Sequence, residues 1–218
     1  MFTMKLPNFK NSWNYENNFL LSCNNFRIAK ILAHYELFKI ASEKQGHFVL
    51  GGVFRGISTV EFATFVELFE KSTDRKIIIF DEFGKFPKNN SDLKSKLIIQ
   101  QMGSTAISIS QLLSILKHKK INNVELIKGK IPTIILDYVK SHPKLKISLL
   151  NLDIDIYDRN LTALFLLYPF IVKGGILILN DYGIFQHETK IIDNYFKNKN
   201  VEIKKFPFSK TPSYIIKK

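Results

Sequence analysis

The sequence predicts an α/β fold in which a mostly parallel sheet is covered by helices on both faces. Short apolar runs rich in β-branched residues alternate with longer segments whose apolar residues recur at helical spacing. A glycine or an acidic residue follows each predicted parallel strand. Parallel strands need a crossover connection, usually a helix, so this alternation favours a parallel sheet. The length of 218 residues fits a single domain, 1–218.

The N-terminal part is predicted to form a helical cover over residues 1–45. Within it, residues 26–42 carry apolar side chains at helical spacing, which predicts a helix with one face on the core. His34 lies in this helix and is expected to be partly exposed. A buried strand over residues 47–53 follows and ends in glycines.

The segment after the first strand matches a capping box. Residues 58–61 read Ser-Thr-Val-Glu, so Ser58 is expected to cap a helix that ends near residue 71. Residues 85–104 combine a proline, two asparagines and a short helical pattern, and they are a candidate lid. The remaining predicted strands span 76–80, 124–128, 146–152 and 175–179, the helices 108–118, 132–139, 158–171 and 188–198, and a C-terminal antiparallel hairpin pairs 201–206 with 213–216.

The composition argues against several classes of protein. The single cysteine, Cys23, cannot form an internal disulfide, and it fits a reducing cytoplasm. Residues 161–179 are strongly apolar, but a proline, a lysine and two glycines interrupt them, so no membrane span is expected. The net charge of +13 would suit a nucleic-acid partner, yet the basic residues are spread along the whole chain. A compositional bias of the genome toward Lys, Asn and Ile is therefore the favoured explanation of the charge. The sequence does not determine the oligomeric state, and a homo-oligomer is one of the alternatives.

Glycines and polar residues after the first two strands indicate a ligand site. In open α/β sheets, ligands bind beyond the carboxyl ends of the strands, where the strand order reverses. Gly51, Gly52 and Gly56 let the backbone approach a ligand, and Ser58 begins a helix whose N–H groups would face it. Asp81, at the end of the second strand, can accept hydrogen bonds from ribose hydroxyls. An aspartate that only forms the turn is the alternative.

Acidic residues after two later strands indicate a metal site. Asp153 and Asp155 follow one strand, and Asn180 and Asp181 follow the next. Oxygen ligands from neighbouring strand ends can converge on one magnesium ion, which prefers such ligands. Asp153 and Asp155 point to opposite sides if the strand continues, so they should have different roles. Loop solvation and capping of the following helix are the alternative interpretation.

These residues together resemble the macrocin O-methyltransferase (TylF-like) family of class I S-adenosylmethionine (SAM)-dependent methyltransferases, over roughly residues 26–196. The resemblance implies a Rossmann-like class I methyltransferase fold with a seven-stranded mixed sheet. The motifs that carry it, in this order, are Gly46-His47-Phe48-Val49-Leu50-Gly51-Gly52-Val53-Phe54-Arg55-Gly56, Phe80-Asp81-Glu82-Phe83 with Pro87, Gly129, Leu152-Asp153-Ile154-Asp155-Ile156-Tyr157, Leu167-Tyr168-Pro169, Gly174-Gly175, Asp181-Tyr182-Gly183 and Ile192-Asp193.

The resemblance also implies methylation of a hydroxyl on a small, sugar-like acceptor, such as a nucleotide-linked sugar or a surface-glycan sugar. A magnesium ion held by Asp153, Asn180 and Asp181 would bind the hydroxyls of the acceptor. Asp155 becomes the candidate general base. His187, near a position where the family has a glycine, is a second candidate, and a surface histidine at a helix start is the alternative. The residues that the resemblance assigns to SAM are Gly51, Gly52, Phe54, Arg55, Gly56, Ser58, Asp81, Glu82, Phe83, Gly129 and Asp153.

Three positions depart from the pattern of the family. Leu50 stands where an acidic residue is usual, Lys130 follows Gly129 where an acidic residue is common, and Asn180 replaces the first member of an Asp-Asp pair. An asparagine still ligates through its carbonyl oxygen, but the lost negative charge should weaken divalent binding. Weak or absent metal dependence is therefore one alternative, and a SAM-binding protein without competent chemistry is another.

A nucleic-acid methyltransferase is a further alternative, which only the charge suggests. It predicts salt-dependent binding to RNA or DNA. The fourth strand ends in Leu-Asp-Ile-Asp at residues 152–155, whereas amino-methylating nucleic-acid enzymes carry an Asn-Pro-Pro-aromatic signature. This difference makes the nucleic-acid interpretation the weaker one. The identity of the acceptor and the carbon whose hydroxyl is methylated do not follow from the sequence.

Overall fold

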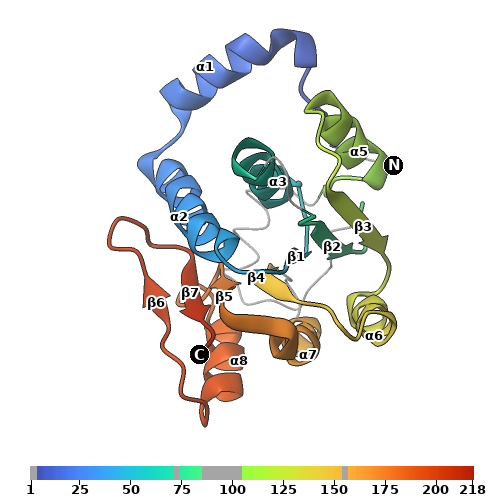
Figure 1. The fold of residues 1–218 in the computed structure, drawn as a ribbon. Coiled ribbons are helices and arrows are strands. Elements are labelled where there is room, and N and C mark those ends of the chain that lie inside the picture. The colour runs from blue at the N-terminus through green and yellow to red at the C-terminus, as the bar shows by residue number, and fades with distance from the viewer. Residues whose placement is uncertain (1–3, 71–73, 85–104, 154–156) are drawn as a thin grey trace.

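A seven-stranded mixed sheet forms the centre of the protein (Figure 1). The structure, a computed structural model, describes residues 4–70, 74–84, 105–153 and 157–218, without the side chains of 157–160, 187 and 188. The strand order is β3-β2-β1-β4-β5-β7-β6, so it reverses between β1 and β4. The strands are β1 (His47–Gly51), β2 (Ile77–Asp81), β3 (Val124–Lys128), β4 (Ile147–Leu152), β5 (Ile171–Leu179), β6 (Lys204–Lys205) and β7 (Ser213–Ile216).

The pairing of the strands confirms the predicted mixed sheet with a C-terminal antiparallel hairpin. The first five strands are parallel: β1 pairs with β2 and β4, β2 with β3, and β4 with β5. Strand β7 is antiparallel to both of its neighbours, β5 and β6. Strand β6 therefore runs in the same direction as the five parallel strands. The carboxyl ends of the five parallel strands therefore lie along one edge of the sheet.

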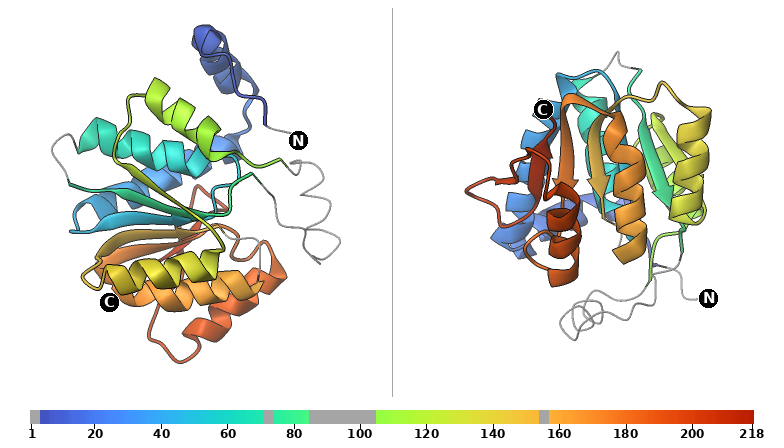
Figure 2. Two further views of the ribbon diagram at one scale, coloured as in Figure 1. Left: turned by 90° about the vertical axis from the view of Figure 1, so that its right-hand side faces the viewer. Right: turned by 90° about the horizontal axis from the view of Figure 1, so that it is seen from below.

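Helices cover both faces of the sheet (Figure 2). One face carries α2 (Asn25–Ser42), α3 (Ile57–Phe69) and α5 (Ile109–His118), and the other carries α6 (Ile131–Ser141), α7 (Tyr157–Leu167) and α8 (Gln186–Phe196). Alternate residues of β1 serve the two faces: Phe48 and Leu50 pack in one core cluster and Val49 in the other. Strands buried on both sides in this way read as continuous apolar runs, which is why the sequence revealed them.

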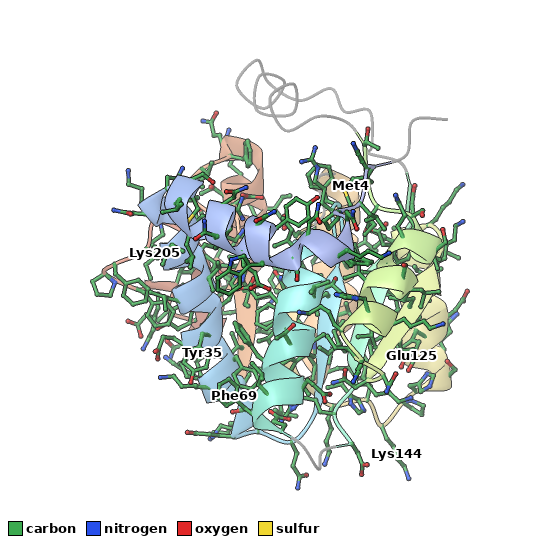
Figure 3. All side chains as sticks on the ribbon, turned by 90° about the horizontal axis from the view of Figure 1, so that it is seen from above. Met4, Tyr35, Phe69, Glu125, Lys144 and Lys205 are labelled. Atoms are coloured by element: carbon green, nitrogen blue, oxygen red, sulfur yellow. The ribbon has the colours of Figure 1, made fainter. Side chains whose placement is uncertain are left out.

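The N-terminal segment crosses over the layer formed by α2, α3 and α5 (Figure 1). The helices η1 (Phe9–Asn11) and α1 (Ser12–Ser22) run from α5 to the start of α2, over α3 (Figures 1 and 3). The segment is attached to α5 at its beginning, because Gln111 donates to the carbonyl of Met4 and the Phe9 ring stacks on His118 at 4.2 Å. Helix α1 itself buries none of its residues.

The predicted boundary between α7 and β5 was wrong. The helix ends at Leu167, a 3-10 turn η2 (Tyr168–Phe170) follows, and β5 begins at Ile171 rather than residue 175. The Lys217 Nζ donates to the carbonyls of Tyr168, Pro169 and Ile171 at 3.1, 2.9 and 2.6 Å, which stabilises the end of the helix there. Lys217 lies far away in the sequence, so the apolar pattern alone could not locate this boundary.

The predicted start of α3 was wrong as well. The helix begins at Ile57, and its N-cap is Gly56, whose φ of 81° is left-handed and suits glycine. Ser58 lies in the first turn and does not cap the helix, and Glu61 bonds to His34 instead of completing a capping box. In the part of the chain that the structure describes, none of the helices is long and apolar enough to cross a membrane.

Candidate functional site

A cleft opens at the carboxyl ends of β1 and β4, where the strand order reverses. It is lined by the turn 53–56 after β1, by Ser58 and Glu61 of α3, by His34 of α2, and by Asp153 after β4. Its volume is about 920 Å³, which falls within the ~300–1,000 Å³ of small-molecule sites. The N-terminal segment closes one side, since Met4, Leu6 and Phe19 also line the cleft.

Backbone hydrogen bonds join the strand ends that border the cleft. The Asp153 N–H donates to the Gly51 carbonyl at 2.8 Å, which ties the end of β4 to β1. The Gly52 N–H donates to Phe80, and the Gly129 N–H donates to Asp81, both at 3.1 Å. The turns after four parallel strands are therefore held in one rigid edge, which a cofactor site requires.

Asp81 holds the glycine turn in place through its carboxylate. Its Oδ2 accepts from the Val53 N–H at 2.6 Å, and its Oδ1 accepts from the Phe83 N–H. Burial raises the pKa of Asp81 above its ordinary value, and the two backbone N–H groups act against that increase. Each carboxylate oxygen has a further lone pair, so the side chain can still accept from a ligand hydroxyl.

Two non-glycine residues beside the cleft have left-handed backbones. Phe54 has a φ of 47° and Phe83 a φ of 51°, conformations that non-glycine residues rarely adopt. Ile107 connects the two turns, because its N–H donates to the Phe54 carbonyl at 2.7 Å and its carbonyl accepts from the Gly84 N–H at 3.0 Å. Backbone strain of this kind is typical of functional sites, where the surrounding structure enforces it.

The structure brings part of the predicted cofactor set onto the cleft. Phe54, Arg55, Gly56, Ser58 and Asp153 line it. The other predicted residues lie at or just after the ends of β1, β2 and β3, outside that lining: Gly51, Gly52, Asp81, Glu82, Phe83 and Gly129. Several of them position the lining through the backbone bonds described above, so their contact with a ligand remains a prediction.

The predicted metal ligands follow neighbouring strand ends, because β4 and β5 pair with Leu152 opposite Leu179. Asp153 lines the cleft, and Asn180 and Asp181 line a small pocket with Tyr182. Asn180 is 3% exposed and its Nδ2 donates to the Asn151 Oδ1 at 2.6 Å, while its own Oδ1 is buried without a partner in the described part of the chain. Within those residues, no group of three His, Cys, Asp or Glu side chains could hold a metal.

The two candidate bases fall where the structure gives no side-chain geometry. Asp155 lies outside the described residues, as does the candidate lid over 85–104. His187 lies in the first turn of α8, and its side chain is not described. Their roles therefore remain predictions.

Sequence reasoning missed a buried pair that lines the cleft. His34 was expected to be partly exposed, but it is 1% exposed, with its Nδ1 3.0 Å from the Glu61 Oε2. The sequence contained a signal for His34 but none for Glu61. Arg27, Lys30 and His34 recur at helical spacing on α2, and all three line the cleft. Glu61 comes from another helix, which no local pattern connects to His34.

The strand order and the glycine turn at its reversal define a Rossmann-like α/β methyltransferase fold, and solved structures share it. CalS11, named a calicheamicin methyltransferase and a TDP-rhamnose 3′-O-methyltransferase, matches with a TM-score of 0.76 and 19% identity, over 94% of this chain and 85% of that one. The O-methyltransferase NovP matches with a TM-score of 0.69 and 18% identity, over 87% and 80%. The S-adenosylhomocysteine (SAH)-bound Podospora anserina methyltransferase PaMTH1 matches with a TM-score of 0.54 and 11% identity, over the whole of both chains.

The sequence itself identifies the family within this class. The sequence profile of the macrocin-O-methyltransferase (TylF) family matches residues 30–209, so the chain belongs to that family. It is a SAM-dependent O-methyltransferase. No curated protein sequence matches the chain significantly.

Proposed function

We propose that the protein transfers the methyl group of SAM to a hydroxyl of a small, sugar-like acceptor, carried on a nucleotide or belonging to a surface glycan. The observation that carries the proposal is the cleft at the strand-order reversal, in a member of an O-methyltransferase family. The name of CalS11 as a TDP-rhamnose methyltransferase supports a sugar acceptor. The single cysteine, Cys23, is free, which supports a cytoplasmic location.

The described residues fit SAM in their chemistry. The first turn of α3 has no side-chain cap, so its N–H groups are available to the carboxylate end of a ligand in the cleft. We expect Asp81, at the end of β2, to accept hydrogen bonds from the ribose hydroxyls. When bound, SAM would supply a sulfonium methyl group for in-line attack by the acceptor oxygen, with cleavage of the carbon–sulfur bond. The role of the chain is then to orient both reactants and to receive the hydroxyl proton.

A magnesium ion is part of the proposal, held by Asp153, Asn180 and Asp181. The support is the buried Asn180 Oδ1, an oxygen of the type that Mg²⁺ binds and that has no partner among the described residues. A bound ion would lower the pKa of the acceptor hydroxyl. Asp155 is the proposed base for the proton, with His187 as the second candidate.

The test is methyl transfer from radiolabelled SAM to a panel of nucleotide sugars, with Mg²⁺ or with EDTA. Transfer that depends on Mg²⁺ and is lost in Asp153→Asn would support the whole proposal. The matched control is Asp74→Asn, an exposed aspartate at the opposite edge of the sheet, which should retain activity. Equal transfer in EDTA would overturn the magnesium assignment alone.

Other outcomes separate the alternatives. Binding of SAH without transfer to any acceptor would indicate a SAM-binding protein that lacks competent chemistry. Transfer to RNA or DNA in place of sugars would establish the nucleic-acid alternative. A protein that does not bind SAH at all would overturn the proposed function.

A further inference from the structure

The buried pair His34–Glu61 links two helices at the wall of the cleft. His34 comes from α2 and Glu61 from the first turns of α3, and their side chains approach to 3.0 Å between Nδ1 and Oε2. The imidazole packs against Phe62 with ring centroids 5.1 Å apart, and the side chains are 1% and 12% exposed. Both residues line the cleft together with Gly56, Ser58 and Asp153.

Each member of the pair has one buried atom without a partner among the described residues. These atoms are the His34 Nε2 and the Glu61 Oε1, and the described residues offer neither of them a hydrogen bond. An unsatisfied buried polar atom destabilises the folded state, so native proteins rarely keep one without a reason. Two such atoms on one bonded pair, in the wall of a cleft, indicate that a ligand completes them.

The chemistry of the two atoms specifies the complementary group. When the His34 Nδ1–H donates to the Glu61 carboxylate, the Nε2 of the neutral ring is an acceptor. The Glu61 Oε1 is also an acceptor, and it belongs to a carboxylate. Two acceptors with negative charge suit an ammonium group, which carries three donors and a positive charge.

We propose that His34 and Glu61 bind the α-ammonium group of the amino-acid end of SAM. The uncapped first turn of α3, with Ser58, then faces the α-carboxylate of the same end, because helix N-termini attract anions. The two charges of the zwitterion thus meet opposite charges in one cleft. This inference rests on the proposed function, since it assigns an anchor for the cofactor of that reaction.

The test compares two probe ligands that differ only at this end. SAH contains the amino-acid group, and 5′-methylthioadenosine keeps the nucleoside and sulfur without it. Calorimetric dissociation constants for both ligands are measured on the unmodified protein, Glu61→Gln and His34→Asn. Glu61→Gln should weaken SAH about tenfold, about 1.4 kcal/mol, and leave 5′-methylthioadenosine unchanged. Glu67→Gln, the same change at an exposed residue of α3, should alter neither ligand.

Three results would overturn the inference. Unchanged SAH binding in both variants would mean that the pair only joins α2 to α3. An equal loss for SAH and 5′-methylthioadenosine would mean that the substitutions act on the fold. In these two cases the proposed function stands, because the unmodified protein still binds SAH. An unmodified protein that binds neither ligand would instead overturn the cofactor site itself, and this inference with it.

Discussion

Asp81 shows how one side chain connects the fold to the site. Its carboxylate accepts the N–H groups of Val53 and Phe83, and these residues begin the turns after β1 and β2. The aspartate therefore acts as a turn-forming residue, and its free lone pairs are available to a ligand. The two interpretations that the sequence left open are compatible with each other in the structure.

Replacing Asp81 by asparagine should affect both stability and cofactor binding. An amide has a single acceptor oxygen, so one of the two backbone N–H groups loses its partner. We expect the free energy of unfolding to decrease by about 1–3 kcal/mol and SAH affinity to fall at least tenfold. Urea unfolding and calorimetry measure the two effects. Asp74→Asn is the matched control, and an Asp81→Asn variant with unchanged SAH affinity would contradict the assignment.

The raised pKa of Asp81 predicts the pH dependence of stability. The unfolded carboxyl titrates near 3.8, and burial raises the pKa in the folded state. Between the two values the folded protein binds more protons than the unfolded chain, so the free energy of unfolding falls as the pH rises through this window. Urea unfolding at a series of pH values should show this decrease in the unmodified protein and lack it in Asp81→Asn. Parallel pH profiles for the two proteins would refute the prediction.

At the scale of elements, the turn from β1 to α3 places the cleft beside a helix N-terminus. Gly56 ends the turn with a φ of 81°, and its N–H donates to the Val53 carbonyl at 2.8 Å. Because the glycine itself is the N-cap, α3 begins immediately after the turn, and its first N–H groups have no side-chain cap. The geometry of this connection, more than any single side chain, prepares the edge for an anionic group.

Gly56→Ala tests this connection, and Gly84→Ala is its control. Both glycines have positive φ, 81° and 75°, so alanine costs about 1–2 kcal/mol of backbone strain at either position. A Cβ on Gly56 would also lie 3.3 Å from the Leu112 Cδ1, whereas one on Gly84 would have none of the described residues within 4 Å. We expect Gly56→Ala to lose more stability in urea unfolding and to bind SAH more weakly. Equal effects of the two substitutions would argue against a packing constraint at Gly56.

At the scale of the whole molecule, the two edges of the sheet serve different purposes. The carboxyl edge carries the cleft, and the amino edge carries a buried cation, Arg75, whose guanidinium lies 4.7 Å from the Phe48 ring centroid. The Arg75 side chain connects several helix and strand ends by donating hydrogen bonds to them. Its partners are the Glu70 carboxylate, the Ser148 hydroxyl and the carbonyls of Ser42, Lys44 and Gly46.

Arg75→Met should therefore destabilise the protein without affecting the cofactor. Removing one partner of a buried ion pair costs about 3–5 kcal/mol, because the carboxylate of Glu70 stays buried without its cation. We expect that decrease in urea unfolding, with SAH affinity unchanged under native conditions. Lys76→Met, which removes an exposed ion pair with Glu125, should change stability by less than about 1 kcal/mol. A weakened SAH affinity in Arg75→Met would show that the two edges are coupled.

Residue patterns along the chain were sufficient to predict the strands, their approximate ends and the turn residues that border the cleft. These features are local: a strand buried on both faces is a continuous apolar run, and chains turn at glycine and aspartate. The strand β3 has the predicted bounds, Val124–Lys128, and Asp81 ends β2 as its position required.

Contacts between residues far apart in the sequence could not be predicted from local patterns. The His34–Glu61 pair and the end of α7 beside Lys217 each depend on contacts between segments far apart in the chain. Ser58 matched a local capping box, but Glu61 had a better partner on α2, and Gly56 could adopt the left-handed conformation that starts the helix earlier. Local propensities differ by only about 1 kcal/mol, so the packing of the whole chain overrides them.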